Sequence, residues 1–320
     1  MASTHDHQPE PIPNWSKVPD TLGFFWPFHV YLFASLFILL ALVSSVALFL
    51  TLRATRRESR SLSTIMLTAV FVLALTRSLI LLTNPYLSKQ IYTSETWIVF
   101  WVLVNGVGGA CLTASMATLL YVTAVATNVT RHAQVRLGRV TVATTICNFA
   151  FLVTSDLVVA FAHEALVMLT VCQTTFAVWG IIVSIGFAIL VYKMRKNARA
   201  GCALASFSPE LRGETERLRR LGLFLGVLSV SGGLFFALRV YEALPIEDEE
   251  FSVDIWLWWG LQTSLRSLEI VNAVVLLLVF KNWTKGLGLQ REHVTMEQVR
   301  GHGHNVLETN ATAGTSTVPL

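Results

Sequence analysis

Charged residues are scarce in this sequence. Of its 320 residues, 14% are charged and 53% are hydrophobic, whereas about a quarter of the residues in a soluble domain are charged. The apolar residues gather into long runs, and about 20 consecutive apolar residues cross a bilayer as a helix. Helices satisfy their own backbone hydrogen bonds in lipid. The sequence therefore predicts an all-α integral membrane protein in contact with the lipid bilayer.

Several reactive residues are missing from the apolar runs. No lysine lies in any run, which excludes a retinal Schiff base. No pair of histidines lies in a run either, which disfavours haem and zinc sites that need imidazole ligands. No Ser–His or paired-Asp set appears there. We therefore expect no enzyme activity, metal, cofactor or nucleic-acid partner.

The sequence has few cysteines, and none of them lies in a loop predicted on the outer face. The four cysteines are Cys111, Cys147, Cys172 and Cys202. The first three fall in apolar runs, so we expect no structural disulfide on the outer face. Cys202 lies in a basic segment beside an apolar run, where palmitoylation is one candidate fate and an unmodified thiol the other.

Seven apolar runs are long enough to span a membrane. They cover residues 28–52, 61–83, 97–125, 139–162, 165–192, 221–244 and 255–280. We interpret 1–23 as a disordered, proline-containing tail, 24–285 as a seven-helix transmembrane domain and 286–320 as a mostly disordered tail. Within the polar segment 193–220, Ser208-Pro209-Glu210 is typical of a helix start that leads into the sixth span.

The basic residues are distributed unevenly between the two sides. Nineteen of the 24 Lys and Arg residues fall after the first, third, fifth and seventh spans. Two fall on the other side and three within spans. The positive-inside rule then places the N-terminus outside and the C-terminus in the cytoplasm. Asn14, in Asn14-Trp15-Ser16, becomes a candidate glycosylation site and the chain a predicted glycoprotein.

Charged residues inside spans are costly, so they normally face inward and pair. The set consists of Arg77, Asp156, Arg239, Glu242, Arg266 and Glu269. We expect Arg266 to pair with Glu269 along one helix face, because they are three residues apart. We expect Arg77 or Arg239 to pair with Asp156 or Glu242 across helices. The set is either a structural group of ion pairs or a ligand pocket open to the outside.

A stripe of small residues marks the third span. Its members are Gly106, Ala110, Ala114 and Thr118, spaced four apart. Such a stripe lets neighbouring helices approach closely, so we expect the third span at the centre of the bundle. The basic segment 193–220 is a candidate surface for a cytoplasmic protein or anionic lipid, although topology alone also explains its charge.

Two short motifs carry a family resemblance. They are Trp26-Pro27-Phe28-His29-Val30-Tyr31 and the stretch from Thr76-Arg77-Ser78-Leu79 to Asn84-Pro85-Tyr86. Both resemble the seven-span region of the proline-rich transmembrane proteins, over roughly residues 15–285. That family carries a long proline-rich segment before its spans, whereas the proline-containing tail expected here covers residues 1–23. The resemblance implies a multi-pass membrane protein and carries over no catalytic or ligand residue.

Three functions remain open from the sequence. The topology matches that of G-protein-coupled receptors, but their motifs are missing: the third span ends without Asp/Glu-Arg-Tyr and the seventh lacks Asn-Pro-x-x-Tyr. The first hypothesis is a receptor-like signalling or scaffold protein. The second is a transporter or channel that uses the intramembrane charges. The third is a structural or sorting protein.

Overall fold

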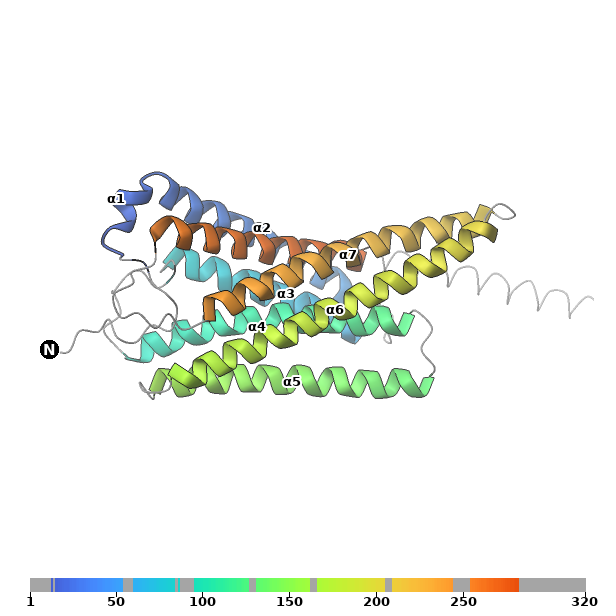
Figure 1. Ribbon diagram of the computed structural model, residues 1–320, viewed down its shortest axis with the longest axis horizontal. Helices are drawn as coiled ribbons and strands as arrows, with labels where there is room; N and C mark the ends of the chain where they lie inside the picture. Colours follow the sequence, from blue (N-terminus) through green and yellow to red (C-terminus); the bar gives the residue numbers. More distant parts are fainter. Residues whose placement is uncertain are drawn as a thin grey trace, which may run out of the picture. The chain divides into compact units, whose positions relative to one another are not determined.

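The computed structural model is built from long helices (Figure 1). It describes residue 13 and residues 15–53, 60–83, 86, 95–126, 131–161, 166–204, 209–243 and 254–281. No strand occurs within these ranges. The labelled helices are α1 (Val18–Leu22), α2 (Phe25–Arg53), α3 (Arg60–Thr83), α4 (Glu95–Ala126), α5 (Arg131–Phe161), α6 (Leu166–Leu204) and α7 (Pro209–Ala243). An unlabelled helix, Ile255–Lys281, follows and is called the last helix below.

Six of these helices are long and apolar enough to cross a membrane. They are α2, α3, α4, α6, α7 and the last helix, and their bounds contain or closely match the predicted spans. The all-helical, multi-pass prediction is therefore confirmed. The predicted fourth span, 139–162, falls on α5, a helix of 31 residues. Since α5 is not among the six, the count of seven and the orientation of the termini stay predictions.

The helices expose large apolar side chains on their outer faces. On α2, for example, Leu39, Leu42 and Leu50 are 57%, 59% and 61% exposed. Continuous apolar surface of this kind is unfavourable in water but favourable in contact with lipid acyl chains. The inner faces bury residues such as Phe37 and Phe187, which are fully enclosed. A helix that is apolar on all sides is expected for a membrane span.

Sequential helices pack against one another. Neighbouring pairs are α2 with α3, α3 with α4, α4 with α5 and with α6, and α6 with α7. Glycines allow several of these contacts: a Cβ on Gly180 of α6 would overlap the Phe236 ring of α7, and a Cβ on Gly109 of α4 would lie 3.4 Å from Phe176 of α6. α4 thus packs against three helices, α3, α5 and α6, and the central position expected for the third span stays a prediction.

The structure differs from the sequence predictions in two segments. Residues 15–22 were expected to be disordered, but α1 forms there and buries Val18 and Leu22. Trp15 packs edge-on against Trp258 at a ring-centroid distance of 5.2 Å. The segment 193–220 was expected to be mainly a polar loop. Instead α6 continues to Leu204, and α7 begins at Pro209, the helix start that the sequence predicts.

The chain divides into two units, residues 1–277 and 278–320. All contacts discussed below lie within the first unit. Of the second unit the structure describes residues 278–281, which form the end of the last helix. The predicted C-terminal tail 286–320 and Asn14 lie outside the described residues.

Candidate functional site

The last helix carries a polar face that is turned into the protein. Its members are Gln262, Arg266, Glu269 and Asn272, which are 2%, 6%, 0% and 0% exposed. Their spacing of four, three and three residues places them on one side of an α-helix. Burying four polar side chains in an apolar span is unfavourable unless each finds partners. The contacts of Glu269 show which groups neutralise the charges.

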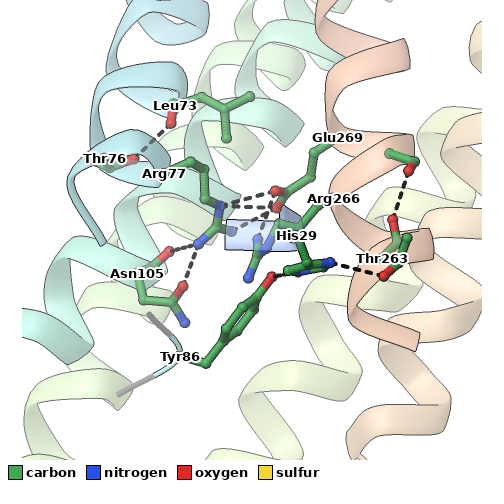
Figure 2. Close-up of polar contacts among 10 residues, drawn as sticks. His29, Leu73, Thr76, Arg77, Tyr86, Asn105, Thr263, Arg266 and Glu269 are labelled. Carbon is green, nitrogen blue, oxygen red and sulfur yellow. Dashed lines mark hydrogen bonds and ion pairs between the residues drawn. The ribbon is translucent and has the colours of Figure 1, made fainter. Parts of the chain in front are cut away.

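Glu269 joins two arginines from different helices (Figure 2). Arg77 of α3 donates from Nη2 to Glu269 Oε1 at 2.8 Å, and from Nε to both carboxylate oxygens at 3.1 Å. Arg266 donates from Nη1 to Glu269 Oε2 at 2.7 Å. Arg77 is 2% exposed and Glu269 is fully enclosed. We call Arg77, Arg266 and Glu269 the charge triad.

Helix α4 completes the surroundings of Arg77. Arg77 Nη1 donates to the Asn105 side-chain oxygen and also to the Asn105 carbonyl oxygen at 3.3 Å. Gly108 lies one turn further along α4, where a Cβ would stand 3.4 Å from Arg77 Cζ and 2.9 Å from Thr76 Oγ1. The missing side chain at Gly108 therefore lets α4 approach the guanidinium group, so the triad ties α3, α4 and the last helix together.

A second polar group lies beside Arg266. His29 of α2, which is 2% exposed, contacts Tyr86 and Thr263: Nε2 lies 2.6 Å from the Tyr86 hydroxyl and Nδ1 lies 3.0 Å from Thr263 Oγ1 (Figure 2). The Arg266 guanidinium carbon sits 5.5 Å from the centre of the Tyr86 ring, a distance at which a cation is attracted by an aromatic face. This group connects α2, the segment after α3 and the last helix.

Tyr86 adopts a backbone conformation that is unusual for its residue type. Its φ of +55° lies in the left-handed region, which costs a residue with a side chain of this size about 1–3 kcal/mol. Burial raises the pKa of the Tyr86 phenol above its ordinary value, so the hydroxyl stays protonated and neutral beside Arg266. The strained residue thus presents both a ring face and a neutral hydroxyl to the site.

Sequence reasoning assigned no role to His29, Tyr86 or Asn105. The signal that could have found two of them was the resemblance itself, because His29 and Tyr86 belong to the two motifs that carry it. Asn105 precedes the glycines of α4. It is a single polar residue that belongs to no motif or periodic pattern, so the sequence did not indicate a role for it.

The structure brings three of the six predicted intramembrane charges together. Arg266 and Glu269 form the expected pair along one helix face. Arg77 pairs with Glu269, an acid that the sequence analysis did not propose for it. The side chains of Asp156 and Glu242 lie outside the described part of the chain. Arg239 on α7 is half-buried, with its guanidinium 5.8 Å from the Phe235 ring centre.

The predicted stripe on α4 is only partly the face that packs. Ala110 is buried, whereas Gly106, Ala114 and Thr118 are half-buried. Other helices come close at Gly108 and Gly109, where an added Cβ would lie 2.9 Å from Thr76 of α3 and 3.4 Å from Phe176 of α6. Cys202 lies on α6, but its side chain is outside the described set. Its modification, like that of Asn14, stays a prediction.

The charge balance of the triad is uneven. Two guanidinium groups face one carboxylate, and Arg266 Nε has no hydrogen-bond partner among the described residues. Asn272 Nδ2, on the same helix, is a buried donor that likewise has no partner among the described residues, although Asn272 Oδ1 accepts from Ser231 of α7 at 2.6 Å. Within the described ranges no group of His, Cys, Asp or Glu residues could hold a metal ion. The arrangement offers hydrogen-bond donors rather than metal ligands.

Six apolar helices with lipid-facing exteriors and an interior charge triad define a multi-pass, integral membrane protein of the helical class. The chain belongs to the family described as the proline-rich transmembrane protein 3 domain, whose model matches residues 2–299. This confirms the family that the motifs around His29 and Arg77 indicate. A comparison with curated proteins gives no match.

Proposed function

We propose that the chain is a receptor-like signalling or scaffold protein of seven spans, in which the charge triad holds helices together. The observation that carries the proposal is the closure of the triad: both oxygens of Glu269 accept hydrogen bonds from arginine, and Glu269 is completely enclosed. Charges that lined a solute path would be expected to face water. Buried charge pairs instead serve to specify which helices associate.

The remaining features support the same role. The positive-inside rule favours an external N-terminus and a cytoplasmic C-terminus, with α5 as the additional span. The basic segment 193–220 then faces the cytoplasm, where a protein or anionic lipid is its proposed partner. We also infer that the chain is not an enzyme, because its apolar spans carry no Ser–His or paired-Asp set.

The test compares Glu269→Gln with a triple variant, R77Q/R266Q/E269Q, in the full-length protein. A structural triad predicts a reduced surface level for E269Q, which leaves two buried arginines without their carboxylate, and a partial recovery in the triple variant, which buries no charge in the triad. Flow-cytometric surface labelling against total expression measures this. Normal surface levels in E269Q would contradict the structural role of the triad.

A second candidate function has one observation in its favour. The triad contains an excess of positive charge, and Arg266 Nε is a buried donor without a described partner. Both features suit an anionic solute, which would make the chain a transporter or channel. Anion flux into proteoliposomes tests this: flux that is present in the wild type and lost in correctly inserted R77Q would replace the first proposal.

A further inference from the structure

Helix α6 extends past the apolar part of its sequence without a break. The candidate span ends at Lys196, whereas the helix continues to Leu204. The basic residues at this end are therefore held on a rigid helical surface instead of a flexible loop. Figure 1 shows α6 and α7 side by side, as their packing requires.

One face of α6 is apolar and exposed along its length. Ile182, Ile185, Ile189 and Tyr192 are 53%, 54%, 52% and 70% exposed. Their spacing of three or four residues places them in one stripe along the helix. In a spanning helix this stripe must contact acyl chains, because no described helix covers it.

The lipid-facing stripe leads directly into basic residues. Lys196 follows Tyr192 by four positions and Arg199 follows Lys196 by three, so both continue the same face, and both are exposed. Lys193 and Arg195 stand beside them and are exposed as well. The helical rise separates Ile182 from Lys196 by about 21 Å, which exceeds half of a hydrocarbon thickness of about 30 Å. We call Lys193, Arg195, Lys196 and Arg199 the basic collar.

The collar differs from Arg219 and Arg220 on α7. Arg219 and Arg220 both pair with Glu216 on their own helix, at 2.9 Å and 3.3 Å. No ion pair joins a collar residue to an acid in the part of the chain that the structure describes. Arg219 and Arg220 are thus partly neutralised by Glu216, whereas no acid among the described residues neutralises the collar.

We propose that the basic collar binds the headgroups of anionic phospholipids. The argument is continuity: the surface that contacts acyl chains passes into the collar on the same helix face, which places the collar at the level of the lipid headgroups. Basic residues at this level attract anionic lipid. The inference deepens the partner proposed for 193–220, and it requires α6 to span the bilayer but neither the charge triad nor the orientation of the chain.

The experiment measures lipid retained by the full-length protein. The protein is equilibrated in mixed micelles with equal phosphatidylserine and phosphatidylcholine, washed by gel filtration, and its bound lipid is quantified by mass spectrometry. We expect the wild type to enrich phosphatidylserine about fivefold or more, the factor that a single basic residue contributes at an anionic surface. The variant K193Q/R195Q/K196Q/R199Q is expected to lose most of this enrichment.

The matched control is R219Q/R220Q, which removes two exposed arginines that pair with Glu216. It should retain most of the enrichment, and all three proteins should elute as single peaks, since every substituted side chain is exposed. Equal retention of the two lipids by the wild type would overturn the proposal, as would equal losses in the two variants. Soluble glycerophosphoserine should not displace the lipid; full displacement would reassign the collar as a site for free phosphates.

Discussion

At the scale of single residues, Glu269 is a fully buried carboxylate that pairs with two arginines. It accepts from Arg77 and Arg266, and the three side chains together carry one excess positive charge. Removing Arg77 would leave a balanced Arg266–Glu269 pair, whereas removing the carboxylate would leave two guanidinium groups facing each other. Electrostatics therefore predicts the order in which neutral substitutions of Glu269, Arg77 and Arg266 destabilise the protein.

We predict that Glu269→Gln is the most destabilising of the three neutral substitutions. Breaking a buried ion pair costs about 3–5 kcal/mol, and this variant breaks two pairs at once. Arg77→Gln and Arg266→Gln should each cost less. Thermal unfolding of the detergent-solubilised proteins, followed by helical circular dichroism, measures the order.

The matched control is Glu216→Gln, which also removes a carboxylate that accepts from two arginines. Its arginines are 76% and 71% exposed, and exposed pairs contribute little. Its unfolding temperature should equal that of the wild type. An Arg77→Gln variant less stable than Glu269→Gln would contradict the charge balance assigned to the triad.

At the scale of helices, Gly108 sets the distance between α3 and α4. A Cβ at this position would meet Thr76 Oγ1 at 2.9 Å and Arg77 Cζ at 3.4 Å, so α4 would have to move away from the triad. We predict that Gly108→Ala destabilises the protein by about 1–3 kcal/mol, the usual cost of overpacking a filled interior. The same thermal unfolding assay measures the change.

Gly226→Ala on α7 supplies the control for this prediction. A Cβ there meets nothing within 4 Å, and alanine is the better helix former by about 1 kcal/mol. This variant should be as stable as the wild type or more stable. Equal stability of the Gly108 and Gly226 variants would show that close packing at Gly108 does not hold the triad in place.

The helices were predictable because each span is a long apolar run with its own backbone hydrogen bonds. The Arg266–Glu269 pair was also predictable, since a separation of three residues fixes the geometry locally. The Arg77–Glu269 pair joins residues 192 positions apart, and its formation depends on which helices pack together. No periodicity in one sequence supplies that information. The burial of Val18 and Leu22 in α1 escaped prediction because the polar, proline-containing composition of residues 1–23 is typical of a disordered tail.

At the scale of the whole molecule, the number of spans decides on which side each end of the chain lies. With six spans the two termini share a side, and with seven they lie on opposite sides. The number of spans depends on whether α5 (Arg131–Phe161), which falls on the predicted fourth span, crosses the bilayer. If α5 did not cross, residues 193–220 and the basic segment after the first span would lie on opposite sides. That arrangement conflicts with the positive-inside rule.

We therefore predict seven crossings, with the N-terminus outside and the C-terminus in the cytoplasm. A C-terminal tag should bind antibody only after the cells are permeabilised, and Asn14 should carry a glycan that is removed by an endoglycosidase and lost in Asn14→Gln. Asn310→Gln, in the predicted cytoplasmic sequon Asn310-Ala311-Thr312, is the control and should leave the glycan unchanged. A tag that is accessible on intact cells together with a glycan on Asn14 would place both termini outside. That result would establish an even number of spans and remove α5 from the bilayer.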